Sequence, residues 1–102
     1  MKKLHNIIYT QNALFNMACI IENIVQYTGY ESSGLIFQED IEKNVNLLAI
    51  FPEMGIDGAI EDTKEIFVNG YRVVYSFTES TVFVITVIHC KMLYPQPINA
   101  NW

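Results

Sequence analysis

A small set of polar residues stands among apolar neighbours near the C-terminal end of the chain. The stretch NGYRVVYSFTESTVFVITVIHCK holds Arg72 near its start and His89 and Lys91 at its end, with Glu65 just before it and Tyr94 just after it. Cleavage of an RNA phosphodiester needs a base for the 2′-hydroxyl, an acid for the leaving oxygen and a cation for the charge on the phosphate. If the five side chains meet, His89 could be the acid or the base and Glu65 a base. Arg72 and Lys91 could stabilise charge, and Tyr94 could stack on a base or donate a proton.

The registers of two predicted hairpins decide whether these side chains meet. Asn69-Gly70 is the typical pair of a two-residue type I′ turn, and it predicts that Phe67 pairs with Arg72. A turn at Glu79-Ser80 predicts that Arg72 pairs with Val87, which makes His89 a diagonal neighbour of Arg72. One face then carries Glu65, Phe67, Arg72, Val74, Ser76, Val87, His89 and Lys91, and is expected to be open. The other, more apolar face carries Ile66, Val68, Tyr71, Val73, Tyr75, Phe77, Val84 and Ile88, and is expected to meet the helices. An ordinary Arg72–Glu65 ion pair and a strand-end His89 remain an equal alternative.

The elements that position these residues are predicted in the order β-α-α-β-β-β. Thr10 is a good N-cap for the first helix and Gly29 stops it, while Ser32 or Ser33 is expected to cap the second helix and Pro52 to end it. The predicted strands are 4–9, 64–68, 71–77 and 82–91, the helices are 11–27 and 34–51, and 52–63 is a loop. We therefore expect an α+β fold with two N-terminal helices on a mostly antiparallel, twisted sheet. Residues 1–94 form its single domain, and 95–102 form a loose tail.

The composition limits the kinds of function. Six Lys and Arg stand against eleven Asp and Glu, so the chain is acidic and suits a basic partner better than extensive contact with phosphates. The sequence has no apolar run long enough to span a membrane and no secretory leader, which indicates a cytoplasmic protein with no membrane partner. Cys19 and Cys90 are expected to be small buried hydrophobes. Two Cys and two His without a CxxC pair predict no metal site, and no cofactor is expected.

The first predicted helix is apolar on more than one side. Leu14, Met17 and Ile21 belong to its main stripe, whereas Phe15 and Ile20 lie outside it. The two outlying residues are therefore candidates for binding a protein partner, although packing against the second helix explains them as well. An unpaired edge strand is a further candidate surface. A monomer and a homodimer are both compatible with the sequence.

Four stretches resemble the RelE/ParE superfamily, the toxins of type II toxin–antitoxin modules. They are IIYTQNALFNMACIIENIVQYT, NLLAIFPEMG, NGYRVVYSF and VFVITVIHCKMLYP, and their order and spacing extend over most of the chain. The resemblance implies a toxin that a cognate antitoxin holds inactive. RelE-like members cleave mRNA on the ribosome, and positions matching Arg72, His89, Lys91 and Tyr94 belong to their active surface. ParE-like members act on DNA gyrase and are not nucleases.

Departures from the nuclease pattern favour the ParE-like branch, the group of plasmid stabilisation proteins. Nuclease members are strongly basic, but this chain is acidic. The strand before NGYR is EIFV, preceded by Lys64 but without the usual basic residues, and Lys91-Met92 follows the histidine where a pair of arginines is frequent. Two alternatives stay open at this point: a RelE-like mRNA endoribonuclease that needs no metal, and a degenerate toxin that only binds an antitoxin.

Overall fold

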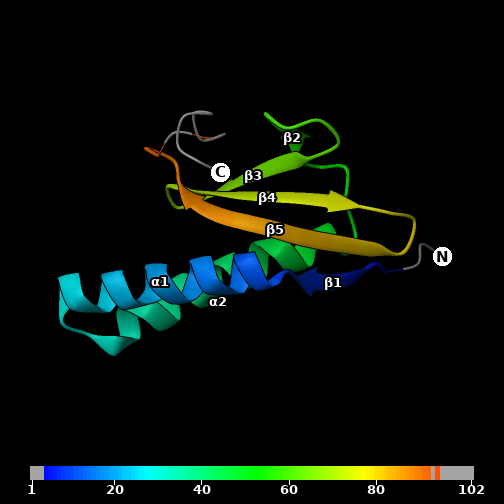
Figure 1. Cartoon of the computed structure of the whole chain (residues 1–102). Coiled ribbons are helices and arrows are strands. Elements are labelled where there is room, and N and C mark those ends of the chain that lie inside the picture. Colours follow the sequence, from blue (N-terminus) through cyan, green and yellow to red (C-terminus); the bar gives the residue numbers. More distant parts are fainter. Residues whose placement is uncertain (1–3, 93, 95–102) are drawn as a thin grey trace.

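A five-stranded mixed sheet carries both helices on one face (Figure 1). The computed structural model describes residues 4–92 and 94. The strand order is β1-β5-β4-β3-β2, with β1 parallel to β5 and the other neighbours antiparallel. The elements are β1 (Asn6–Tyr9), α1 (Gln11–Thr28), α2 (Glu31–Leu48), β2 (Ile56–Asp57), β3 (Lys64–Val68), β4 (Tyr71–Phe77) and β5 (Thr81–His89). The predicted α+β architecture is confirmed.

Both ends of α1 follow their local signals. The Thr10 hydroxyl accepts a hydrogen bond from the Ala13 N–H at 3.1 Å, which satisfies one of the free donors of the first turn. At the other end Gly29 has φ 79°, a left-handed conformation that glycine adopts without steric cost. The predicted cap and stop of this helix are therefore confirmed.

Both ends of α2 differ from the prediction. The helix begins at Glu31, with Tyr30 as an N-cap that makes no side-chain hydrogen bond, so Ser32 and Ser33 lie inside the first turn. It ends at Leu48, three residues before the predicted end, and a turn at Ala49 and Ile50 leads the chain to Pro52. The two helices are in close contact at Gly34, where an added Cβ would lie 2.8 Å from a methyl group of Ile21.

The segment 52–63 contains a short strand that the sequence did not reveal. Ile56 pairs with Glu65 and Asp57 pairs with Lys64, so β2 lengthens the sheet by one edge strand. Lys64 Nζ lies 3.2 Å from Asp57 Oδ1. Two residues between glycines carry no alternation of apolar and polar residues, which is why the pattern predicted a loop.

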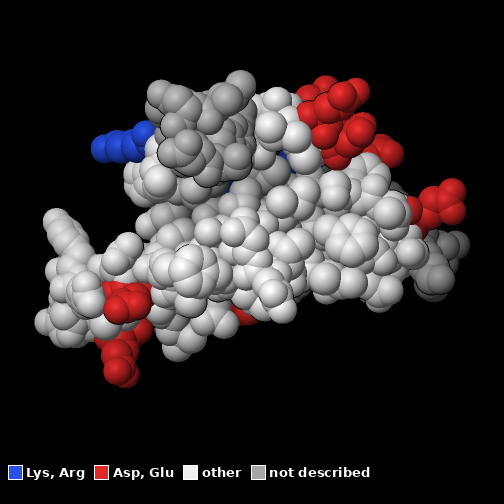
Figure 2. All heavy atoms as spheres, in the orientation of Figure 1, with Lys and Arg blue, Asp and Glu red and all other residues white. Residues whose placement is uncertain are grey.

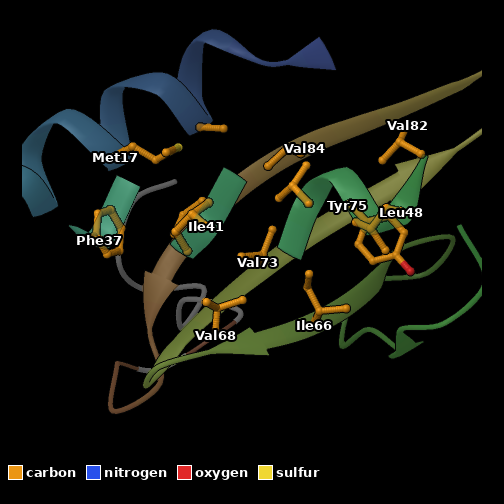
Figure 3. Packing of buried hydrophobic residues seen from close by; sticks show 13 residues of the cluster. Met17, Phe37, Ile41, Leu48, Ile66, Val68, Val73, Tyr75, Val82 and Val84 are labelled. Carbon is orange, nitrogen blue, oxygen red and sulfur yellow. The ribbon is translucent and has the colours of Figure 1, made fainter. Parts of the chain in front are cut away.

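The core lies between the helices and the covered face of the sheet (Figure 3). The buried side of α1 is centred on Ala13 and Met17. Leu14, predicted to belong to the buried stripe, is 54% exposed, whereas Ile20, predicted to lie outside it, packs against the core. The buried cluster consists of Ala13, Met17, Phe37, Ile41, Val45, Leu48, Ile66, Val68, Val73, Tyr75, Val82, Val84 and Val87. None of the helices in the described part of the chain could span a membrane.

Candidate functional site

Arg72 is enclosed on the outer face of the sheet, which is the face away from the helices. Its Nε atom lies 3.5 Å from Glu65 Oε1, an ion pair without hydrogen-bond geometry. The guanidinium carbon lies 5.7 Å from the ring centre of Phe67 and 5.4 Å from that of Tyr94. Glu65 is only 5% exposed, and its Oε2 atom accepts a hydrogen bond from the Ala59 N–H at 3.0 Å. We call Glu65, Phe67, Arg72 and Tyr94 the Arg72 cluster. The guanidinium of Arg72 is engaged by the other three residues of this cluster.

The outer face is less open than the sequence predicted. Glu65 and Val74, which are paired across β3 and β4, are both buried. The loop before β3 reaches this face, since its Ala59 N–H binds the Glu65 carboxylate. A phosphate therefore has restricted access to the carboxylate that was expected to act as a base.

The Tyr94 hydroxyl is a weak acid in this setting. Burial raises its pKa, the charge of Glu65 raises it further, and Arg72 opposes them. A phenol with a raised pKa keeps its proton at neutral pH and releases it reluctantly. The cluster thus favours a packing role for this ring over proton transfer.

His89 lies on the helix-covered face, and this corrects the predicted convergence with Arg72. Arg72 pairs with Ile88 and His89 pairs with Tyr71, one residue away from the predicted register. The His89 and Tyr71 rings meet edge to face with centres 5.2 Å apart, and His89 Nδ1 accepts a hydrogen bond from the Lys91 N–H at 3.1 Å. Lys91 itself is exposed beyond the end of β5. The structure therefore brings Arg72, Glu65 and Tyr94 together and separates them from the imidazole.

A β-bulge in β5 causes this separation. Tyr75 pairs with Val84 as the turn predicts, but Val74 pairs with Thr86, so Ile85 is an extra residue on β5. Because side chains alternate between faces, one extra residue moves every later side chain to the opposite face. Val87 and His89 become covered by the helices, and Ile88 joins Arg72 on the outer face.

Polar side chains at the start of α1 hold the bulge. The Thr10 hydroxyl donates to the Ile85 carbonyl at 2.9 Å. Asn16 Oδ1 accepts from the Thr86 hydroxyl at 2.6 Å and from the Val87 N–H at 3.3 Å. These contacts satisfy backbone groups at the irregular part of the ladder. In the sequence, the one feature that could have indicated the bulge was Asn16, a polar residue on the side of the predicted helix that faces the sheet.

A groove of about 400 Å³ lies between α1 and the end of β5. We call it the α1–β5 groove; it contains both residues predicted to bind a partner. Phe15 is 67% exposed, whereas Ile20 is partly buried against the core. Cys19 is exposed here and Cys90 is intermediate, so the prediction of two buried thiols was wrong. The groove is lined by Phe15, Asn16, Cys19, Ile20, Asn23, Tyr71, Val87, Ile88, His89 and Met92, none of which is Lys, Arg, Asp or Glu.

A larger groove of about 770 Å³ lies at the opposite end of β5, beside the β4–β5 turn. We call it the turn groove; it is lined by His5, Phe51, Pro52, Glu53, Met54, Phe77, Thr78 and Glu79. Tyr75 fixes one wall, because its hydroxyl donates to the Pro52 carbonyl at 2.7 Å and accepts from the Gly55 N–H at 3.0 Å. Asp and Glu side chains gather at this end of the molecule (Figure 2). No group of three His, Cys, Asp or Glu within residues 4–92 and 94 could hold a metal ion.

Comparison with known proteins agrees with this fold. The family model for the ParE toxin of the type II toxin-antitoxin system, parDE, matches residues 7–94. A solved structure of the chromosomal ParDE TA system from P. aeruginosa contains a chain with a TM-score of 0.77 and 12% sequence identity, covering 86% of this chain and 98% of that chain. At this identity the likeness shows the fold alone. None of the curated protein sequences matches this chain.

Because the family match spans most of the chain, this protein belongs to the ParE toxin family of type II toxin–antitoxin systems. The predicted superfamily and the ParE-like branch are confirmed, and the nuclease and degenerate-toxin alternatives are not favoured. Membership in a toxin–antitoxin family implies a cognate antitoxin as a partner.

Proposed function

We propose that this protein is a growth-inhibiting toxin that acts on DNA gyrase in the cytoplasm and does not cleave mRNA. The observation that carries the proposal is the bulge at Ile85, which puts His89 on the face opposite Arg72. Without an imidazole beside the cation, the outer face lacks the acid–base pair that metal-free phosphodiester cleavage requires. The acidic charge of the chain also argues against extensive contact with ribosomal RNA.

The Arg72 cluster has a structural role in this proposal. Arg72, Glu65 and Tyr94 hold the loop before β3 and the chain after β5 against the sheet. Removing an exposed polar side chain such as Lys91 then changes toxicity little, because that residue performs no chemistry. His89 likewise contributes packing against Tyr71 and no proton transfer.

The test is a supercoiling assay with purified bacterial DNA gyrase, run beside an mRNA cleavage assay in a translation extract. The wild type is expected to inhibit gyrase and to leave mRNA intact, and the variants His89→Ala and Lys91→Ala are expected to behave in the same way. Intact gyrase activity combined with mRNA cleavage that is lost in His89→Ala would contradict the proposal and support the nuclease.

The α1–β5 groove is the proposed docking site for the antitoxin. Its lining contains no Lys, Arg, Asp or Glu, and its rim includes Phe15 and Met92, which are 67% and 51% exposed. An apolar groove between a helix and a sheet suits an amphipathic segment that buries one or two large side chains. Ile20 forms part of the floor and Phe15 part of the rim.

Co-expression with the antitoxin gene that accompanies the toxin tests this site. Phe15→Glu is expected to remain toxic and to escape neutralisation, because it places a charge on an apolar rim. Leu35→Glu is the matched control; Leu35 is 56% exposed on α2 and does not line the groove. Equal neutralisation of both variants would show that the antitoxin binds another surface of the toxin.

A further inference from the structure

Two polar residues of the α1–β5 groove have their acceptor atoms occupied by groups of the protein itself. Asn16 Oδ1 accepts from the Thr86 hydroxyl and from the Val87 N–H, so the group that Asn16 can offer to a partner is its Nδ2 donor. His89 Nδ1 accepts from the Lys91 N–H, and this bond assigns the hydrogen of the neutral imidazole to Nε2. Both residues line the groove. The groove therefore presents hydrogen-bond donors to a partner.

The turn after β5 places a cation beside this groove. The Met92 N–H donates to the His89 carbonyl at 3.0 Å, and the Cys90 N–H donates to the Gly70 carbonyl in the β3–β4 hairpin at 2.8 Å. Along the chain Lys91 lies between two residues of the lining, His89 and Met92, and it is exposed. Basic side-chain atoms project at the end of the molecule where β5 ends (Figures 1 and 2). The ammonium group of Lys91 thus extends from backbone that is fixed next to the imidazole donor.

Donors beside a cation favour a carboxylate as the bound group. An ionised carboxylate only accepts hydrogen bonds, and bonds to an ionised acceptor are about twice as strong as neutral ones. A lysine or arginine of a partner would instead bring more donors and a like charge to the groove. Phe15 and Ile20 add apolar walls, which exclude water and strengthen the pairing. The groove therefore matches an Asp or Glu that stands next to an apolar side chain.

The bulge at Ile85 brings the imidazole to this groove. Without the extra residue His89 would lie on the outer face with Arg72, since every later side chain of β5 would change face. The irregularity that takes the imidazole away from the outer face thus supplies the groove with a donor. The partner that membership in the toxin–antitoxin family implies is the cognate antitoxin.

We propose that the antitoxin segment in the α1–β5 groove carries an Asp or Glu, whose carboxylate accepts from the His89 Nε2–H and pairs with the Lys91 ammonium group. An apolar side chain of the same segment packs on Phe15 and Ile20. This inference rests on the docking site proposed above and names the side chains that the site selects. An antitoxin of another module with a neutral or basic residue at this position is then rejected, which makes His89 and Lys91 specificity-determining residues.

Charge reversal at Lys91 tests the site. The antitoxin encoded beside the toxin gene is purified, and its affinity for the full toxin chain is measured by surface plasmon resonance. Lys91→Glu is expected to bind the antitoxin about tenfold more weakly, the scale of a lost charged contact at an interface. Lys43→Glu is the control of equal charge change, at an exposed position of α2 that does not line the groove, and is expected to match the wild type.

A second variant removes the donor and keeps the packing. His89→Phe retains a ring against Tyr71 and loses the Nε2–H, so it too is expected to bind about tenfold more weakly. Melting temperatures are measured for all variants, so that a loss of affinity is read only from folded protein.

A reciprocal exchange identifies the carboxylate. Each Asp and Glu in the toxin-binding segment of the antitoxin is changed in turn to Lys. One of these antitoxin variants is expected to regain most of the affinity for the Lys91→Glu toxin, because the exchange restores an opposite pair of charges.

The outcomes separate this inference from the docking site on which it rests. Wild-type affinity in Lys91→Glu and His89→Phe, together with weaker binding by Phe15→Glu, would overturn the inference and leave the docking site standing. Weaker binding by Lys91→Glu that no antitoxin exchange restores would also overturn it. Wild-type affinity in all three variants would remove the docking site and the inference together. The gyrase assay contains no antitoxin, so its result bears on the proposed toxic activity alone.

Discussion

On the outer face of β4, Arg72 is held by a carboxylate and two aromatic rings, whereas on the covered face of the same strand Tyr75 is held by two backbone groups. The carboxylate of Glu65 is buried and the guanidinium of Arg72 is mostly enclosed, and each needs the opposite charge, since desolvation of an unpaired charge costs several kcal/mol. The neutral hydroxyl needs only one donor and one acceptor, which the loop after α2 supplies. The two faces of one strand thus bind neighbouring loops through different chemistry, and the loss of a partner should cost more on the outer face.

The variant Glu65→Ala should have the largest effect. It leaves the enclosed Arg72 without its counter-charge and the Ala59 N–H without its acceptor, so unfolding free energy should fall by about 3 kcal/mol. Chemical denaturation of the variant against the wild type measures the loss. Glu61→Ala, at an exposed position, is the control and should stay within about 0.5 kcal/mol. Equal stability of both variants would show that Arg72 does not depend on its carboxylate.

Tyr75→Phe should cost somewhat less, about 2 kcal/mol, because it leaves the Pro52 carbonyl and the Gly55 N–H without their shared partner. Thermal unfolding gives the stability, and hydrogen exchange at Gly55 reports the loosened loop. The control is Tyr27→Phe, since Tyr27 is 84% exposed on α1. Unchanged exchange at Gly55 in the Tyr75 variant would mean that the loop is held by other contacts.

Asn16→Ala probes the bulge that separates the two faces. Loss of the bonds to the Thr86 hydroxyl and the Val87 N–H should lower stability by about 1 kcal/mol. The NMR signals of His89 should shift as the end of β5 loosens. Gln26→Ala, at an exposed position of the same helix outside the α1–β5 groove, should change neither quantity. A stable Asn16 variant with unshifted His89 signals would show that β5 keeps its bulge without α1.

Tyr9→Phe should have the smallest effect at neutral pH. In the described part of the chain the buried Tyr9 hydroxyl makes no hydrogen bond, so its removal should change stability by less than about 0.5 kcal/mol. Burial, and then the charge of Glu42, raises the pKa of Tyr9 to about 12. A raised pKa stabilises the fold below pH 10 and that contribution is lost as the pH rises from 10 to 12. Stability measured over this interval should therefore fall less steeply in Tyr9→Phe, and parallel curves for both proteins would contradict the raised pKa.

The predictions that depend on residues close together in the sequence were confirmed, whereas a prediction that depends on distant contacts was wrong. Asn69 and Gly70 both have positive φ, 49° and 85°, as a type I′ turn requires, and the register of β3 with β4 follows from that turn alone. In the second hairpin, the pairing of β4 with β5 follows the register set by the turn only from Phe77 to Tyr75. Beyond that point Asn16, seventy residues away from Thr86, decides the pairing.

The order of the main elements, the cap at Thr10, the stop at Gly29 and the family could all be predicted from the sequence, because they depend on contacts between near neighbours or on composition. The face that each polar residue of β5 occupies depends instead on contacts that form only in the folded protein. One extra residue, Ile85, reverses the alternation of side chains, and the backbone groups that it leaves unpaired are satisfied by side chains of α1. Such a bulge is stabilised by partners that meet it only after the chain has folded, so the strand's own residues carry no sign of it.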